Sequence, residues 1–170
     1  MKTTKKGFTL IELIVVIAII GVLAAILVPS MLGYVKKSKV SSANSTASTL
    51  QKAINTTLIE VDEETQDAGS ITHISSSKNT AACTCTGLPS GTTDAQVWSK
   101  IENYMEKAKK LKFEAACEGA ACKAVAVALD DTYTGTAPGG VVTVDNYKSY
   151  NNANDPNLAD ALSGALVKAS

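Results

Sequence analysis

Arginine is absent from this chain of 170 residues and histidine occurs once, so most of the usual anion-binding and general-base side chains are missing. All sixteen basic residues are therefore lysines, and sixteen acids balance them. Nucleic-acid-binding proteins usually carry a basic excess and use arginine for bidentate contacts, so this balance argues against that class. The composition predicts a protein that is not an enzyme, has no catalytic residues and requires no cofactor.

The apolar residues, which make up 45% of the chain, are distributed unevenly. A short basic N-terminus ends at Gly7 and precedes an apolar block from Phe8 to Val28, which only Thr9 and Glu12 interrupt. A helix over this block is about 31 Å long at about 1.5 Å per residue, enough to cross the hydrocarbon core of a bilayer. The short basic N-terminus favours an orientation with the rest of the chain exported.

Three explanations of this apolar block differ in whether they account for the carboxylate of Glu12. In a cleaved secretory signal, Ala24-Ala25 would be the cleavage site, but the apolar run continues to Val28. A plain membrane anchor does not need a carboxylate near its start, where burial in lipid is unfavourable. In a segment that leaves the membrane and packs against copies of itself, Glu12 would find a cationic partner.

The residues around Gly7 carry a specific motif. Residues 5–13, Lys-Lys-Gly-Phe-Thr-Leu-Ile-Glu-Leu, resemble the cleavage motif of type IV prepilins, in which a basic leader ends in glycine before Phe, Thr, Leu, a branched apolar residue and Glu. The resemblance covers about residues 1–50, includes Pro29, and does not extend beyond about residue 60. It implies that a prepilin peptidase cuts between Gly7 and Phe8 and methylates the new amine of Phe8.

The same resemblance implies three regions and an assembly mechanism. Residues 1–7 would be the leader peptide, residues 8–35 the hydrophobic helix that serves as membrane anchor and then as filament core, and residues 36–170 an α+β head that includes the second half of the long helix. Glu12 would pair with the Phe8 amine of a neighbouring subunit. Gly21 and Pro29 are the expected weak points of the helix, because proline removes a backbone hydrogen bond and clashes with the preceding turn.

The rest of the chain is read from periodicity. Seven apolar residues at helical spacing predict that one long helix, from about Phe8 to Ile59, turns one face toward a core: Val40, Ala43, Ala47, Leu50, Ile54, Leu58 and Val61. We expect a connector over residues 60–93, then a helix from Asp94 to about Leu111 with Thr93 or Asp94 as its N-cap. Strands are expected at 113–116, 123–129 and 141–144, with a turn-rich connection over 130–140. A final helix is expected from Pro156 to about Val167, capped by Asp155. The predicted fold class is α+β, a long N-terminal helix packed on a small antiparallel sheet, which is the type IV pilin fold.

The four cysteines lie in the part of the chain that we expect to be exported, where oxidation is possible. They are Cys83, Cys85, Cys117 and Cys122. Their spacing is also compatible with a zinc site, and the even count does not distinguish the two. Export favours two disulfides and no metal site. Because neighbours at i and i+2 of a strand rarely bridge, we expect Cys83 and Cys85 each to pair with one of the other two cysteines, in either order.

The resemblance implies a structural function, polymerisation into a type IV pilus. The expected partners are copies of the chain, the prepilin peptidase, the pilus assembly machinery and, before assembly, the membrane. The expected location is the cytoplasmic membrane and then the cell-surface pilus. Two alternatives are a pseudopilin of a type II secretion or DNA-uptake system and an uncut, single-pass surface binding protein. Four lysines between residues 107 and 112 raise the possibility of DNA contact, although such clusters are usually solvated.

Overall fold

The computed structural model describes residues 7–151 and 156–170. The chain divides into two compact units, Met1–Lys36 and Lys37–Ser170, and the long helix α1 (Leu10–Thr65) contributes to both. The helix therefore begins two residues later and ends six residues later than its pattern predicts. Asp155, the expected N-cap of the last helix, lies outside the described residues.

In the first unit, the side chains of α1 are exposed on every side. Each residue from Gly7 to Val35 is exposed, including the large apolar side chains, and the most apolar part of the helix has a mean hydropathy of 3.2. By length and composition this helix is able to cross a membrane. An apolar surface of this extent requires a cover of lipid or of other protein, because water solvates it poorly.

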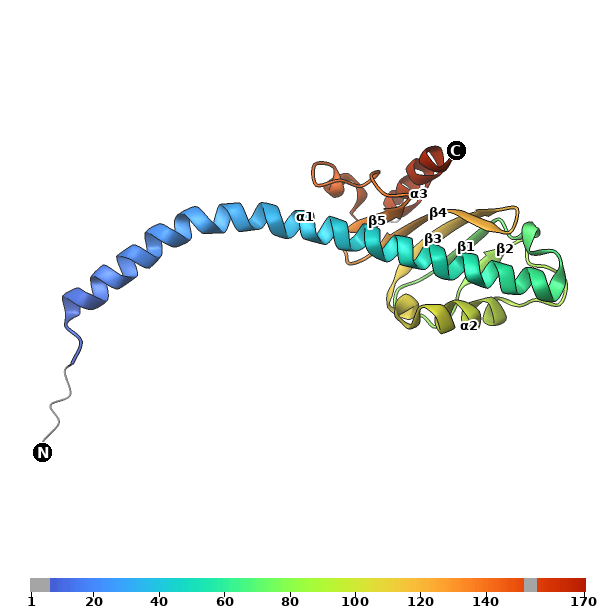
Figure 1. The fold of residues 1–170 in the computed structure, drawn as a ribbon, viewed down its shortest axis with the longest axis horizontal. Helices are drawn as coiled ribbons and strands as arrows, with labels where there is room; N and C mark the ends of the chain where they lie inside the picture. Colours follow the sequence, from blue (N-terminus) through green and yellow to red (C-terminus); the bar gives the residue numbers. More distant parts are fainter. Residues whose placement is uncertain (1–6, 152–155) are drawn as a thin grey trace, which may run out of the picture. The chain divides into compact units, whose positions relative to one another are not determined.

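The second unit contains a five-stranded antiparallel sheet of order β2-β1-β3-β4-β5 (Figure 1). Its strands are β1 (His73–Ser76), β2 (Thr84–Thr86), β3 (Lys112–Glu118), β4 (Ala121–Ala128) and β5 (Thr134–Ala137). The other elements are the helices α2 (Asp94–Tyr104) and α3 (Pro156–Ala169) and the short 3₁₀ turns η1 (Ala68–Ser70), η2 (Glu106–Lys110) and η3 (Tyr147–Tyr150). The predicted α+β class, with a long N-terminal helix and an antiparallel sheet, is confirmed.

One face of the sheet is covered by the second part of α1. All seven apolar residues of the predicted stripe are buried there, and Ala53 and Thr57 complete the buried face. Five of them pack with Ile74, Phe113, Val125 and Val127 of the sheet and with Val97, Trp98 and Ile101 of α2: Ala47, Leu50, Ile54, Leu58 and Val61. Val40 instead packs in the cluster that contains α3. Because this apolar contact stabilises the helix, α1 continues for many residues beyond Pro29.

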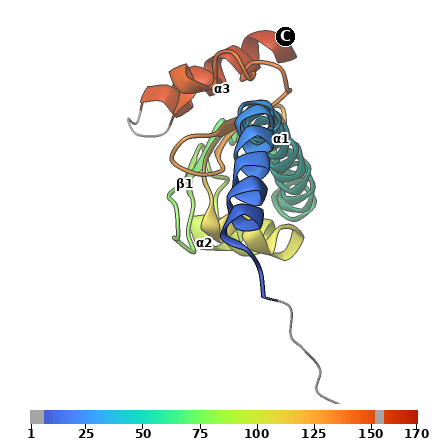
Figure 2. The ribbon, with the colours of Figure 1, turned by 90° about the vertical axis from the view of Figure 1, so that its left-hand side faces the viewer.

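The opposite face of the sheet carries α3. Ala124 and Ala126 of β4 pack against Leu158, Ala161 and Leu162, whereas Val125 and Val127 of the same strand point toward α1. The alternation follows from the two-residue period of a strand, and the small alanines leave room for the second helix. In the second unit, α3 and α2 accordingly lie on opposite sides of the sheet (Figure 2).

Side-chain amides of α1 fasten the helix to the backbone of the sheet. Asn44 Oδ1 accepts a hydrogen bond from Thr136 N at 2.9 Å, and Asn55 Oδ1 accepts one from Cys122 N at 2.7 Å. Gln51 Nε2 donates to Cys122 O and Lys123 O, both at 3.1 Å. The ladder between β3 and β4 is irregular beside Cys122 and Lys123, so Gln51 and Asn55 satisfy backbone groups that the sheet does not pair.

A capping box starts α2, as the sequence predicts from Thr93 or Asp94. Thr93 is the N-cap, its hydroxyl accepts from Gln96 N at 3.3 Å, and Gln96 Oε1 accepts from Thr93 N at 2.8 Å. Lys100, further along α2, lies 2.7 Å from Glu64 and 3.4 Å from Glu60 of α1. Its hydrogen bond to Glu64 raises the pKa of Lys100, so the lysine stays charged across ordinary pH.

Three predicted elements differ from the structure. The segment 60–93, expected to be a connector, contains the end of α1 and the strands β1 and β2. Residues 141–144 do not form a strand, and β5 lies instead at Thr134–Ala137, inside the stretch that looked like a turn. The predicted helix after Asp94 ends at Tyr104 and continues only as η2. In the first two cases tertiary pairing outweighs local propensity, because strands this short depend on their neighbours.

Gly135 allows the closest approach between α1 and the sheet. A Cβ atom at this position would lie 2.1 Å from both the C and O atoms of Ala43 and 2.5 Å from Asn44 N. These are backbone atoms of a helix whose inner face is packed on the sheet, so they have little freedom to move. Glycine is therefore required at this position for β5 to pack against α1.

We expect Gly135→Ala to lower the free energy of unfolding by about 3 kcal/mol, because the new methyl group overlaps the backbone of α1. The measurement is guanidinium unfolding of a form that lacks residues 1–36, followed by far-UV circular dichroism. Gly139→Ala is the matched control, since a Cβ there would meet only Thr136 O, at 3.9 Å. Equal effects of the two substitutions would contradict the close approach.

Candidate functional site

The predicted cleavage point lies in an exposed, non-helical segment. Gly7, Phe8 and Thr9 precede the first residue of α1, and the Phe8 side chain is 83% exposed. A peptide bond outside regular structure is accessible without unfolding of the helix that follows. The geometry is thus compatible with processing between Gly7 and Phe8, which stays a prediction.

Glu12 belongs to a second capping box, which the sequence analysis did not identify. Its Oε2 accepts hydrogen bonds from Thr9 N at 2.8 Å and Thr9 Oγ1 at 2.6 Å, while Glu12 N donates to Thr9 Oγ1 at 3.3 Å. Threonine followed three residues later by glutamate, just before an apolar run, was the available signal. Glu12 therefore helps to start α1, in addition to any function in assembly.

The charge of Glu12 has no cationic partner in this part of the molecule. Within residues 7–151 and 156–170, no salt bridge joins Glu12 to a lysine, the histidine or a terminus. The residues beside it are apolar: Phe8, Ile11, Val15 and Val16 line an open hollow of about 300 Å³ with Glu12.

Gly21 and Pro29 both lie inside α1, and the helix is continuous through them. A Cβ atom at Gly21 would meet no described atom within 4 Å, so nothing in the described part of this chain requires glycine there. Small residues such as glycine permit close approach between helices. The predicted unwinding between the two residues stays a prediction.

The cysteines form two neighbouring pairs. Cys83 and Cys85 lie on the same side of strand β2, with their Sγ atoms 3.6 Å apart, and Asp94 Oδ1 accepts a hydrogen bond from Cys85 N at 2.8 Å. The hydrogen bond with Cys83, burial and the charge of Asp94 together raise the pKa of the Cys85 thiol. Asp94 was considered only as a helix cap in the sequence analysis, because its nearness to the cysteines depends on how α2 packs.

The second pair is Cys117 and Cys122, which lie directly opposite each other on β3 and β4. A two-residue turn, Gly119-Ala120, joins the strands, with φ near +59° at both residues. The thiol–thiol contact lowers the pKa of Cys117 and raises that of Cys122. Cys117 N donates a hydrogen bond to Thr72 O at 2.8 Å and therefore does not bond to β4. Cys117 and Cys122 thus resemble a non-hydrogen-bonded pair of an antiparallel ladder, in which the side chains of the two facing residues are closest.

The structure does not bring the two pairs together, so the crosswise pairing expected from the sequence does not fit this sheet. Strand β1 lies between β2 and β3. With strands about 4.8 Å apart, β2 and β3 are separated by about 10 Å. Cα atoms more than about 7 Å apart are not bridged without movement of the backbone. The order of the strands, which the sequence did not reveal, decides this point.

The lysines near the end of α2 form no uniform basic surface. Lys109 lies 3.5 Å from Glu102 and 3.6 Å from Glu106, and Lys112 is engaged in an interaction of its own. Carboxylates beside these lysines reduce the local positive potential. The arrangement gives no support to DNA contact at this surface.

Comparisons with known proteins agree with the motif at the N-terminus. The family described as the prokaryotic N-terminal methylation motif matches residues 2–28. The chain is 48% identical to the type IV major fimbrial protein FimA of Dichelobacter nodosus over 60 residues, which are 35% of this chain and 38% of that protein. No solved structure matches the chain at a significant level.

Two further relatives are similar to this chain over segments of different length. A fimbrial protein of Moraxella nonliquefaciens is 52% identical over 52 residues, 31% of this chain and 34% of that protein. The type IV major pilin protein PilE1 of Neisseria gonorrhoeae is 34% identical over 125 residues, 72% of this chain and 58% of that protein. The chain thus spans less than two thirds of the length of each of these relatives.

An apolar N-terminal helix behind a glycine–phenylalanine processing motif, followed by an α+β head, defines the class of type IV pilin-like proteins. This chain is pilin-like in its motif and its fold, and over part of its length it is similar to the named fimbrial and pilin proteins.

The facing positions of Cys117 and Cys122 predict a disulfide in protein purified from cells without reductant. Closing a loop of this size stabilises the fold by about 2 kcal/mol in the entropic model, so reduction should lower the melting temperature by about 5 to 10 °C. Peptide mapping identifies the bridge and calorimetry measures the shift. Replacing Cys83 and Cys85 by serine should leave the effect intact, and its loss in that variant would contradict the assignment.

Proposed function

We propose that this protein is the structural subunit of a type IV pilus, inserted in the cytoplasmic membrane as a prepilin, cut after Gly7, methylated at Phe8 and assembled through α1. The observation that carries the proposal is the combination of the processing motif with an apolar helix that is exposed on all sides. The named relatives support a filament, since all three are described as fimbrial or pilin proteins.

The exposed part of α1 requires two different covers in turn. Before assembly, lipid covers residues 8–35, with the head on the exported side. After cleavage, the same residues leave the bilayer and pack against copies of themselves in the filament core, with the heads outside. The apolar surface of residues 8–35 is suited to both environments because it has no polar side to keep in water.

Cleavage creates a new cation four residues before Glu12. In the precursor the nitrogen of Phe8 is part of a peptide bond and is neutral, whereas after cleavage it is an amine that is protonated at neutral pH. We infer that this amine pairs with Glu12 of a neighbouring subunit. Pairing offsets the unfavourable burial of each charge, so it selects the axial position of the entering subunit more than it adds stability.

Gly21 and Pro29 contribute to the flexibility of the assembled helix in this proposal. Proline lacks the N–H group that would close the preceding turn, and glycine lowers helix propensity. The segment between them is therefore the part of α1 with the weakest internal hydrogen bonding. Unwinding of this segment would let a filament extend without separation of its subunits.

Processing is tested by the mass and the N-terminal sequence of the protein isolated from cell-surface material. We expect the chain to begin at methylated Phe8, because Gly7 is exposed and precedes a complete cleavage motif. A bulky or charged residue in place of Gly7 should stop cleavage. Retention of Met1 would favour the uncut surface anchor, and a start after Ala25 would favour a secretory signal.

Assembly is tested at Glu12 with two variants that separate its cap from its charge. Gln96 shows that glutamine completes a capping box in this protein, so Glu12→Gln keeps the cap and removes the charge. Glu12→Ala removes both. If charge pairing drives assembly, both variants should be inserted and cut but should form few filaments, because the neighbour's ammonium is buried without a partner.

The measurement is electron microscopy of sheared surface material beside a membrane immunoblot of the same cells. Thr9→Ala is the matched control, since it weakens the cap and leaves the carboxylate in place. Normal filaments from Glu12→Gln would exclude the charge pair and leave capping as the function of this residue. Short, non-sheared assemblies from the wild type would favour a pseudopilin.

A further inference from the structure

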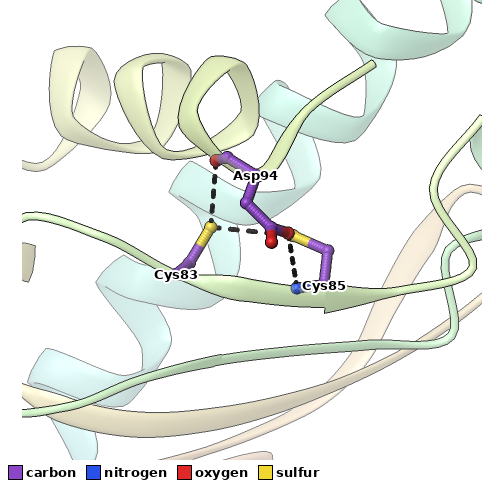
Figure 3. Close-up of side chains that lie close together, drawn as sticks. All are labelled: Cys83, Cys85 and Asp94. Atoms are coloured by element: carbon purple, nitrogen blue, oxygen red, sulfur yellow. Dashed lines mark hydrogen bonds between the residues drawn. The ribbon is translucent and has the colours of Figure 1, made fainter. Parts of the chain in front are cut away.

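Cys83, Cys85 and Asp94 bring three metal-binding side chains together at one edge of the head. The cysteines come from the edge strand β2 and its preceding residue, and Asp94 is the first residue of α2 (Figure 3). Their ligand atoms all lie within 4.8 Å of one another. Cys83 is buried, while Cys85 and Asp94 are half-buried, so the cluster is shielded but reachable from solvent.

The distances suit a tetrahedral metal site. Two thiolates at about 2.3 Å from a zinc ion, separated by the tetrahedral angle, have sulfur atoms about 3.8 Å apart. The Sγ atoms of Cys83 and Cys85 are 3.6 Å apart before any ion is present. Asp94 is already oriented, because its Oδ1 accepts from Cys85 N at 2.8 Å and the capping box fixes the start of α2.

Disulfide formation explains this pair less well. Two residues apart on an extended strand, the Cα atoms are about 6.7 Å apart and the Cβ atoms point the same way. This is the upper end of the range found in disulfides, whose mode is about 5.5 to 6 Å. The remaining cysteines, Cys117 and Cys122, face each other across β3 and β4, and β1 separates these strands from β2. Cys83 and Cys85 therefore have no suitable disulfide partner.

We propose that Cys83, Cys85 and Asp94 bind a zinc ion, which takes two thiolates, one carboxylate oxygen and a water molecule as its fourth ligand. Soft sulfur ligands in a tetrahedral set select zinc over the hard cations magnesium and calcium. Binding releases the two thiol protons to solvent, so the site carries two thiolates, one carboxylate and the dication. The proposal goes beyond filament assembly and replaces the expectation of a disulfide at this pair.

The ion would act as a structural clamp. β2 has three residues and pairs only with β1, so it is the least supported strand of the sheet. A metal held jointly by β2 and by the first residue of α2 ties this edge to a helix that packs in the core. Bound zinc also protects both thiols from oxidation in the exported head.

The test is titration of the full-length protein in detergent with Co²⁺, whose spectrum reports thiolate ligands and tetrahedral geometry. We expect stoichiometric uptake with a thiolate-to-cobalt charge-transfer band, reversed by one equivalent of Zn²⁺. Replacing Cys83 and Cys85 by serine should abolish the band. Replacing Cys117 and Cys122 by serine should leave it unchanged, which makes that variant the matched control.

Asp94→Asn provides a milder variant, since asparagine keeps an acceptor for Cys85 N and preserves the start of α2. It should keep the fold, as judged by far-UV circular dichroism, and weaken zinc binding by at least about tenfold. The proposal is overturned if the wild type takes up no cobalt, or if the band persists without Cys83 and Cys85. A Cys83–Cys85 disulfide in protein isolated from cells would overturn it as well.

Discussion

The exposure of every side chain between Gly7 and Val35 is the constraint on which the rest of this protein depends. A helix that is apolar on all sides is not stable in water, so it needs lipid or other helices around it. The continuation of the same helix is apolar on one side only and lies on the sheet of the head. One element therefore joins two environments, and the change from one pattern to the other falls near Lys36.

The head is built to hold this helix firmly. Gly135 lets β5 approach the backbone of α1, and Asn44, Gln51 and Asn55 bond to backbone groups of β4 and β5. Hydrogen bonds from helix side chains to strand backbone are directional, so they fix the position of the helix along the sheet more closely than apolar contact does. A pull on α1 would therefore be transmitted to the sheet.

Two capping boxes in one chain clarify the chemistry of Glu12. Thr93 and Gln96 begin α2 with a neutral pair, and Thr9 and Glu12 begin α1 with a charged one. A neutral residue is sufficient for capping, so the carboxylate at Glu12 exceeds what the helix requires. A charge beside an apolar surface is unfavourable unless it is compensated.

The amino-acid sequence by itself determined the class of the protein, the apolar helix, the buried stripe from Val40 to Val61 and the processing motif, because each depends on local pattern or on periodicity. The motif at Thr9 and Glu12 was also present but was not recognised as a capping box. The tertiary structure decided the strands at His73–Ser76, Thr84–Thr86 and Thr134–Ala137, since short strands exist through their pairing. It also separated the cysteines into two pairs and placed Asp94 beside Cys85, because strand order and helix docking join residues that are distant in sequence.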